Sequence, residues 1–458
     1  MTIPQIDTDL LTAAYATLNQ AFADLSGGAG FEGPGADAEL SVSAQDALQA
    51  TAIRLQDNYP YHHPNYAGQM LKPPHPIAQL AYTLAQSINP NNHALDGGRA
   101  SSAMEKEAVA HIAAMFGWQE QHLGHLCSGG TVANLEALWV AREQTNPGAK
   151  LVSSEFSHYT HSRLSGVLGM AHSSVAADQY GRMDINALRQ TLDQFDVGTV
   201  VATLGTTSFG SIDPLAEIVA LKKEYGFRLH VDAAYGGYFK LLPELPGARD
   251  FAALFEVDSI VIDPHKHGLQ PYGCGCVLFA NPKDGAVYAH ESPYTYFTSE
   301  ELHLGEISLE CSRPGAAAVA LWATQKMLPN VTDGNFASDL RQSREAAVRL
   351  HAMLQASERW QPLLTPDLDV VVWVAHSKSI SEASRRSRSL FEALAKRDIH
   401  IALLKVDASF AATCGLELHE DSDTLTCLRV SLMKPEHNAW LSSFVEQLDA
   451  LSDSVLQE

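Results

Sequence analysis

The chain has 458 residues, of which 46% are hydrophobic and 18% charged, so it can bury a large core. Its 31 basic and 53 acidic residues give a formal net charge of −22 without a basic cluster, which argues against nucleic acid as a main partner. No apolar run approaches the ~18 residues of a membrane span, and the six cysteines lack the paired spacing of a zinc site. We therefore expect neither a membrane nor a metal partner.

Residues 1–85 are predicted to form an N-terminal helical segment. Leu11, Ala14 and Leu18 recur at helical spacing, and a glycine-rich stretch at 27–30 interrupts the pattern. The first residues, MTIPQIDTDL, have neither the basic nor the apolar region of a signal peptide. Together with cysteines that are expected to be reduced thiols, this favours a cytoplasmic protein.

Residues 86–335 are predicted to form a large α/β domain. It opens with a helix that begins at a capping box, Ser102 to Glu105, and stops at Gly117. Strand-like runs then alternate with helices, and these runs are Leu151-Val152, Thr199 to Ala202, Arg228 to Val231, Ile260 to Ile262 and Val277 to Phe279. Such alternation predicts a mostly parallel sheet with helices on both faces.

One helix between these strands is marked at both ends. Asp213 is its predicted N-cap, Pro214 takes its first position and Gly226 is its stop. Isoleucine and leucine at helical spacing between them predict one buried face.

Residues 336–458 are predicted to form a small C-terminal α+β domain packed on the first. Its elements are a helix at about 338–354, a strand at Val370 to Val372, a helix at about 382–396, a strand at Leu428 to Leu432 and a final helix from about 436.

Two of the strand-like runs each deliver a polar residue at their C-terminal end. Asp232 ends one of them, and the other leads into Asp263-Pro264-His265-Lys266. Open α/β sheets bind their ligands at this edge. A lysine can form a Schiff base with pyridoxal phosphate (PLP), and a carboxylate can keep the pyridine nitrogen protonated. Either residue alone is most simply a solvated surface group, but the pair predicts a PLP site.

Other polar residues follow neighbouring strands. Gly130 and Thr131 open a helix after Ser128-Gly129, where backbone N–H groups and the helix dipole attract an anion such as the cofactor phosphate. A simple capping turn is the alternative. His158 can stack on a pyridine ring and meet a substrate carboxylate, or cap the next helix. Thr207 can reach the ring oxygen or the carboxylate.

These motifs, in this order, resemble the group II PLP-dependent amino acid decarboxylases, which have the aspartate-aminotransferase fold (fold type I). The resemblance covers roughly residues 60 to 435, and the stretch at Asp263 is closest to the archaeal tyrosine/aspartate decarboxylases. It implies an α/β fold type I chain with a mostly parallel central sheet, PLP as the cofactor, and a homodimer whose active sites take residues from both subunits.

The resemblance also implies roles for single residues. Lys266 is the Schiff-base lysine, Asp232 the partner of the pyridine nitrogen, and His158 the group stacked over the ring. The cofactor-binding residues implied are Gly130, Thr131, His158, Thr207, Asp232, Ala234, His265 and Lys266. Those implied near the substrate are His63, Tyr66 and Arg429, although a structural salt bridge is as good an account of Arg429.

The proton that returns to the substrate carbon needs a donor. Ser292 to Thr298 lies in a long polar segment, and the family is thought to deliver this proton from a tyrosine on a mobile loop. Tyr296 is expected to be that catalytic residue, with Tyr294 as the alternative. Both can equally be packed loop tyrosines.

Two departures from the family pattern stand out. Asp263 replaces an asparagine, and an ionised carboxylate cannot donate a hydrogen bond to phosphate, so we expect no phosphate role for it. Gly68 stands where glutamate-specific enzymes have an asparagine, which weakens a glutamate assignment.

The predicted function is decarboxylation of an L-amino acid, either aromatic and tyrosine-like or acidic, to an amine and CO₂. One alternative is a carbon–carbon lyase of the sphingosine phosphate lyase type, which Cys311 to Gly315 also resembles. It would need extra basic residues for a substrate phosphate. The other alternative is a catalytically inactive PLP-fold binding protein, against which the presence of Lys266, Asp232 and His158 together argues.

Overall fold

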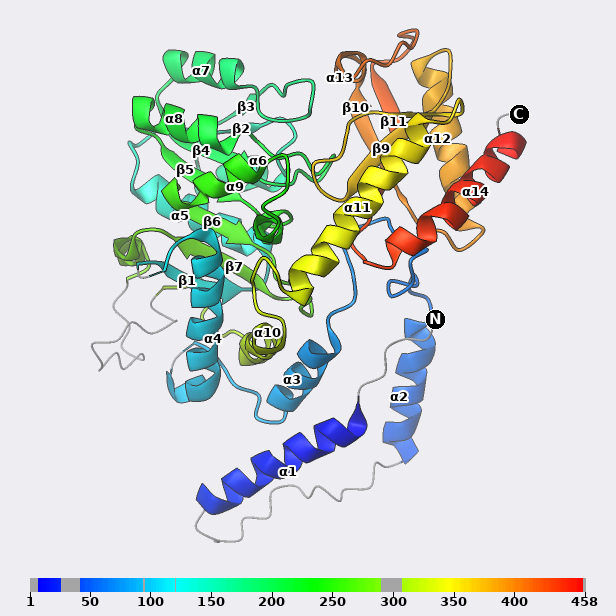
Figure 1. Cartoon of the computed structure of the whole chain (residues 1–458). Helices are drawn as coiled ribbons and strands as arrows, with labels where there is room; N and C mark the ends of the chain where they lie inside the picture. The colour runs from blue at the N-terminus through cyan, green and yellow to red at the C-terminus, as the bar shows by residue number, and fades with distance from the viewer. Residues whose placement is uncertain (1–6, 26–41, 94, 120, 290–306, 456–458) are drawn as a thin grey trace.

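The computed structural model describes residues 7–25, 42–93, 95–119, 121–289 and 307–455 (Figure 1). Two sheets organise these residues, and each carries its own helices. No helix within the described ranges has the length and apolar character needed to cross a bilayer.

A central sheet of seven strands has the order β1-β7-β6-β5-β4-β2-β3. The strands are β1 (Leu123–Cys127), β2 (Lys150–Ser154), β3 (His172–Val175), β4 (Val197–Thr203), β5 (Arg228–Asp232), β6 (Ser259–Ile262) and β7 (Gly275–Phe279). Neighbours from β3 through β6 pair in parallel, while β7 runs antiparallel to both β1 and β6. The predicted mostly parallel sheet is confirmed.

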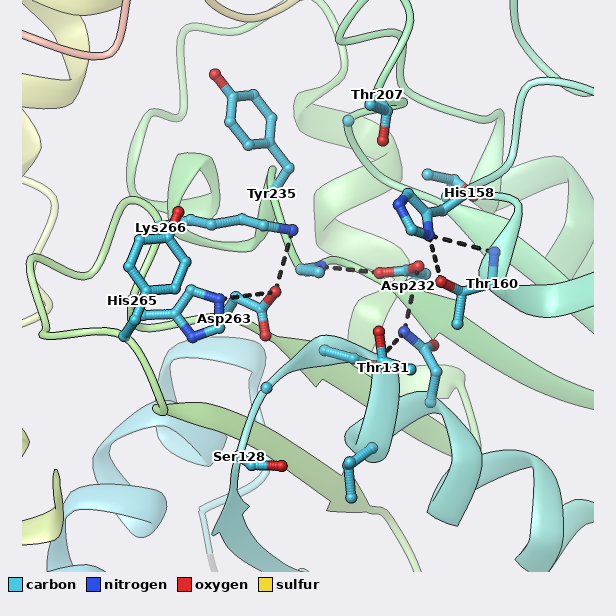
Figure 2. Close-up of a pocket in the computed structure, with 18 residues that line it drawn as sticks. Ser128, Thr131, His158, Thr160, Thr207, Asp232, Tyr235, Asp263, His265 and Lys266 are labelled. Carbon is cyan, nitrogen blue, oxygen red and sulfur yellow. Dashed lines mark hydrogen bonds and ion pairs between the residues drawn. The ribbon is translucent and has the colours of Figure 1, made fainter. Parts of the chain in front are cut away.

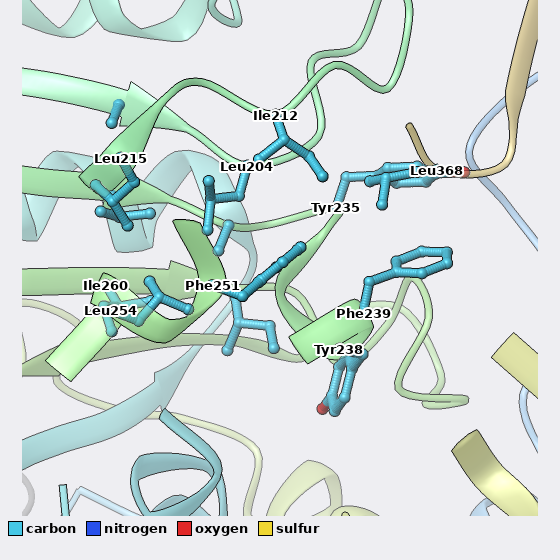
Figure 3. Packing of buried hydrophobic residues seen from close by; sticks show 14 of the residues in the cluster. Leu204, Ile212, Leu215, Tyr235, Tyr238, Phe239, Phe251, Leu254, Ile260 and Leu368 are labelled. Atoms are coloured by element: carbon cyan, nitrogen blue, oxygen red, sulfur yellow. The ribbon is translucent and has the colours of Figure 1, made fainter. Parts of the chain in front are cut away.

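Helices cover this sheet and enclose the main core. They are α4 (Leu95–Phe116), α5 (Gly130–Glu143), α6 (Thr160–Leu168), α7 (Ile185–Gln194), α8 (Leu215–Tyr225), α9 (Ala248–Ala252) and α10 (Gly315–Met327). Figure 3 shows part of the core, where Leu204, Ile260 and Leu254 pack with Phe251 and Phe239. All of these side chains are buried, so the sheet forms a rigid base for the strand ends.

The predicted capping box at Ser102 is wrong. The helix α4 already begins at Leu95, with non-helical backbone at Gly98, so Ser102 and Glu105 lie inside it. The Glu105 carboxylate acts across the fold instead, because Oε1 accepts the backbone N–H of Leu126 at 2.9 Å and pairs with Nη1 of Arg313 at 2.7 Å. The Glu105 side chain, which the local sequence pattern predicts to cap the helix, therefore binds Leu126 and Arg313 instead.

The predicted N-cap at Asp213 is also wrong. Pro214 occupies the N-cap position of α8, and the Asp213 carboxylate accepts backbone N–H groups from Met183 and Thr203, each at 2.7 Å. The predicted stop is confirmed, because Gly226 follows the helix with a φ of +80°.

A second sheet lies in the C-terminal part, with four antiparallel strands in the order β10-β11-β9-β8. The strands are β8 (Trp360–Pro362), β9 (Val370–Ala375), β10 (Ala402–Asp407) and β11 (Thr424–Ser431). The helices are α11 (Asn335–Gln355), α12 (Ile380–Ala395), α13 (Ala408–Thr413) and α14 (His437–Val455). The five predicted elements of this part are present, and β8, β10 and α13 are additional. The exact domain boundaries stay a prediction.

The N-terminal helices stand apart from both sheets (Figure 1). They are α1 (Thr8–Leu25) and α2 (Val42–Leu55), and α3 (Pro76–Gln86) links them to the body. Contact is sparse, with Tyr15 donating from its hydroxyl to the carbonyl of Thr83 at 3.3 Å. The predicted glycine interruption at 27–30 lies outside the described residues.

Candidate active site

A cavity of about 360 Å³ opens at the C-terminal ends of the parallel strands (Figure 2). Its walls come from the β1–α5 turn, the β2–α6 loop, the ends of β4 and β5 and the β6–β7 loop. The predicted cofactor residues Gly130, Thr131, His158, Thr207, Asp232, Ala234, His265 and Lys266 all line it. The fold therefore brings this whole set together from five separate segments.

Asp232 is the last residue of β5, and its carboxylate has three protein donors. Oδ1 accepts the backbone N–H of Ala234 at 3.1 Å, while Oδ2 accepts Nε2–H of His161 at 2.9 Å and Nδ2–H of Asn134 at 3.4 Å. Burial alone would raise the pKa of Asp232. The hydrogen bond and charge of His161, with the charge of Lys266, outweigh it and hold the pKa well below its usual range.

A buried polar chain orients one of these donors. Asn134 also donates from Nδ2 to the carbonyl of Gly130 at 2.8 Å, and its Oδ1 lies 2.8 Å from Nε2 of His230. Burial lowers the pKa of His230 to about 3, so this ring is neutral. Its Nε2–H donates to Asn134, and Nδ1 faces Ser259 Oγ at 2.9 Å. The chain fixes the amide so that its NH₂ group faces Asp232.

His161, Asn134 and His230 were not predicted from the sequence. A signal for His161 was present, because it lies in the first turn of α6, three residues after the predicted His158. Its side chain is completely buried against Asp232. His230 gave no signal, because it sits inside an apolar strand.

Lys266 extends into the cavity from the loop between β6 and β7 (Figure 2). Its Nζ lies 3.0 Å from Oδ2 of Asp263, and Nε2 of His265 lies 3.5 Å from the same oxygen. The His265 ring stacks on Tyr272, with centroids 4.7 Å apart and planes inclined by 31°. The loop thus presents one amino group, one carboxylate and an aromatic pair to the cavity.

His158 is held in one tautomer. Its Nδ1 accepts the backbone N–H of Thr160 at 3.3 Å and lies 2.5 Å from the Thr160 hydroxyl. Burial lowers the pKa of His158, and the nearby Asp232 carboxylate only partly offsets this. The ring is therefore neutral with its proton on Nε2, which makes Nε2–H a hydrogen-bond donor.

The turn before α5 is tightly packed and leaves the helix end without a side-chain cap. A Cβ atom on Gly275 would come 2.6 Å from the backbone of Gly129, and one on Gly129 would come 3.2 Å from Cε1 of His265. Glycine is therefore required for these segments to approach each other. The uncapped N–H groups at the start of a 14-residue helix form an anion-binding end beside the Thr131 hydroxyl.

The predicted substrate residues lie outside the lining of this cavity. Nδ1 of His63 accepts the backbone N–H of Asn65 at 3.0 Å, which closes a local turn. Tyr66 is buried, and its carbonyl accepts Nζ–H of Lys434 at 2.6 Å. Arg429 is buried on β11 and donates to the carbonyls of Ser208 and Gly68, each at 3.2 Å. Tyr294 and Tyr296 lie outside the described residues.

Tyr235 is a lining residue that the sequence did not single out. Its hydroxyl donates to Oδ1 of Asp369 at 2.6 Å, and Oδ2 of Asp369 lies 3.2 Å from Nε2 of His267. Asp369 immediately precedes β9, so this buried contact ties the cavity wall to the C-terminal sheet.

Residues 56–375 match the family model described as the pyridoxal-dependent decarboxylase conserved domain. An L-tyrosine decarboxylase of Enterococcus faecium is 29% identical over 443 residues, covering 72% of each chain. A probable L-tyrosine/L-aspartate decarboxylase of Methanosphaerula palustris is 31% identical over 264 residues, covering 57% of this chain and 69% of the relative.

Solved structures give the same fold at low identity. The crystal structure of Oryza sativa TDC with PLP and tryptamine has a TM-score of 0.78 at 16% identity and covers 99% of both chains. That of mouse CSAD has a TM-score of 0.77 at 20% identity, covering 94% of this chain and 92% of the other. The predicted fold type I architecture is confirmed, and PLP is the cofactor. The chain belongs to the pyridoxal-dependent decarboxylase family, and it is a PLP-dependent amino acid decarboxylase.

Proposed function

We propose that this cavity decarboxylates an L-amino acid with an aromatic side chain, with PLP held between Asp232 and Lys266. The observation that carries the proposal is a buried carboxylate with three donors that shares one cavity with a lysine amino group. PLP, when bound, supplies an aldehyde that condenses with amines and a ring that accepts the electrons of a breaking bond. An ionised Asp232 keeps the ring nitrogen protonated, and burial strengthens that interaction.

The other lining residues have roles that fit their positions. The start of α5, with Gly130 and Thr131, would hold the phosphate. Ala234 would lie under the ring and His158 over it. Because Thr160 holds Nδ1, the Nε2–H of His158 is free to donate to the substrate carboxylate and orient the bond that breaks. Tyr296 stays the proposed proton donor on the resemblance alone.

The composition of the lining supports an aromatic substrate. Tyr235 and Tyr272 line the cavity, and Tyr272 is 57% exposed, which places it at the opening. Lys266 is the only lysine or arginine among the described lining residues, so an acidic side chain would enter without a cationic partner. The alternative function as a lyase on a phosphorylated substrate would likewise lack a cationic side chain to bind the substrate phosphate. Aromatic rings offer an aromatic side chain stacking contacts.

Substrate preference is tested by measuring CO₂ release with the purified enzyme across the twenty amino acids, dopa, diaminobutyrate and cysteine sulfinate. We expect kcat/KM to be largest for tyrosine, dopa or another aromatic amino acid, by about tenfold or more over aspartate and glutamate, since each 1.4 kcal/mol of differential binding is tenfold. A preference for aspartate would contradict the aromatic assignment. Arg429 would then be the candidate partner of the acidic side chain, because its buried Nη2 has no partner among the described residues.

We further propose that the enzyme is a cytoplasmic homodimer. Leu48, Ile53 and Leu55 on α2 are each more than half exposed, and burying exposed apolar side chains against a second copy is a common solution. The compartment is supported by the described cysteines, all of which are free thiols.

Light scattering at assay concentration is expected to give twice the chain mass of 49.6 kDa. Replacing Leu48, Ile53 and Leu55 together by serine should shift the equilibrium toward monomer and reduce turnover in parallel, because each exposed apolar side chain contributes to the contact. A matched control replaces Val167, which is 73% exposed on α6, by serine. A fully active monomer would refute the shared-site proposal.

A further inference from the structure

The carboxylate of Asp263 lies against the first residue of α5, where the cofactor phosphate is proposed to bind (Figure 2). A Cβ atom on Gly130 would come 2.7 Å from Oδ2 and 3.0 Å from Oδ1 of Asp263. The side chain is only 3% exposed. A negative charge thus already stands at the positive end of this helix.

The two oxygens of this carboxylate have unequal surroundings. Oδ2 faces the amino group of Lys266 at 3.0 Å and Nε2 of His265 at 3.5 Å. Oδ1 is buried and accepts no hydrogen bond from any residue that the structure describes. Burying a carboxylate oxygen without a hydrogen-bond donor is energetically unfavourable, because no new bond replaces its hydration. Only one oxygen of Asp263 therefore has partners among the described residues, and Asp263 lines the cavity.

A phosphate ester at this place carries about −1.5 to −2 charges near neutral pH. It would seek the end of α5, against which Asp263 lies, and the amino group of Lys266, which Asp263 contacts. Two anions a few ångströms apart in a buried site repel each other strongly. Asparagine has the same shape without the charge and could donate a hydrogen bond to the phosphate.

We propose that Asp263 is a built-in competitor of the cofactor phosphate, which weakens PLP binding and speeds its exchange. The inference rests on the proposed phosphate position at α5. A polar residue at a phosphate site is usually expected to strengthen binding. Asp263 is proposed to do the opposite, so removing its charge should increase the affinity for PLP. The fraction of wild-type enzyme that holds PLP then depends on the free PLP concentration. The Asp263→Asn variant is expected to keep its PLP at lower free concentrations.

The test compares Asp263→Asn with the wild-type full-length protein. The dissociation constant of PLP, measured by fluorescence titration after dialysis against cysteine, is expected to fall by about tenfold or more in the variant. The rate at which PLP leaves into an excess of a PLP-scavenging protein should fall by a similar factor. Glu256→Gln is the matched control, because it removes one charge from a side chain that pairs with Lys223 away from the cavity. The control should leave both quantities unchanged.

Inorganic phosphate is a second probe, because it tests the phosphate site without the aldehyde and ring of PLP. Inorganic phosphate should raise the melting temperature of the dialysed Asp263→Asn protein at concentrations about tenfold lower than it needs with wild type. Should the asparagine variant fail to fold, Asp263→Ser removes the same charge with a smaller side chain.

An unchanged or weaker affinity for both PLP and phosphate in a folded neutral variant would overturn the proposal. It would make Asp263 a support for Lys266 and His265 instead. Failure of PLP to attach to Lys266 in any form would instead count against the proposed function. The two failures are thus distinguishable.

Discussion

Replacing Lys266 with alanine is expected to abolish covalent cofactor attachment and to lower turnover by roughly 10²–10⁴-fold or more, as for loss of a positioned acid–base group. Lys266 is the one lysine of the cavity lining that the structure describes, so no neighbouring amino group can replace it. The measurement is reduction of the loaded enzyme with borohydride, followed by peptide mapping. The wild-type enzyme should carry the pyridoxyl label on the peptide that contains Lys266, and the variant should carry none.

Lys240→Ala provides the matched control. Lys240 lies in the short helix Gly237–Leu241 that follows β5, and it does not line the cavity. This variant should bind the cofactor covalently and keep its activity. A label on Lys240, or on Lys72, which donates to the carbonyl of Met433, would show that the cofactor site has been assigned to the wrong lysine.

Much of the site could be predicted because strand order alone brings its parts together. In a parallel sheet, the carboxyl ends of neighbouring strands meet at one edge. Asp232 is the last residue of β5, and His158, Thr207 and Lys266 follow β2, β4 and β6. Their positions in the sequence therefore already imply one cavity. No knowledge of side-chain packing was needed for that step.

The groups that support these residues could not be predicted in the same way. His230 reaches Asn134 from within a strand, and His125 in β1 faces Glu136 on α5 at 2.8 Å, with both side chains fully buried. In β1 the glycine and histidine at positions 124 and 125 interrupt the apolar pattern that marks a strand. This accounts for the failure to predict β1, and β3 was missed because an edge strand that is half exposed has little apolar signal.

Local patterns also failed where a distant partner used the side chain. Asp213 and Glu105 have the residue types and positions of helix-capping groups, yet both accept backbone N–H groups from other segments, 10 to 30 residues away in the sequence. Asp213 is fully buried, and burial raises its pKa to about 7 even though two N–H groups favour its ionised form. Capping propensity is worth ~1 kcal/mol, and such tertiary contacts readily outweigh it.

Asp232→Asn is expected to lower turnover by about 10²–10³-fold with the cofactor saturating, the range typical for removal of one well-placed electrostatic group. Asparagine keeps the shape of the side chain and can still accept one of the hydrogen bonds that Asp232 receives from His161 and Ala234. It cannot hold a proton on the pyridine nitrogen, because the amide is neither charged nor basic. The ring then accepts electrons poorly, and the step that breaks the bond to the carboxylate slows.

Stability must be measured beside kinetics, because Asp232 is buried and its neighbours depend on it. Leaving Nε2–H of His161 or Nδ2–H of Asn134 without an acceptor should lower the free energy of unfolding by about 1–3 kcal/mol.

Asp258→Asn is the control. Asp258 pairs with Lys222 at 2.8 Å outside the cavity, so its loss should affect folding slightly and turnover not at all. If Asp232→Asn retained more than about a tenth of wild-type kcat at saturating PLP, the electrostatic role of Asp232 would be wrong. The variant is fully folded at lower temperature. If the fall in kcat disappeared there, Asp232 would contribute to folding and not to catalysis.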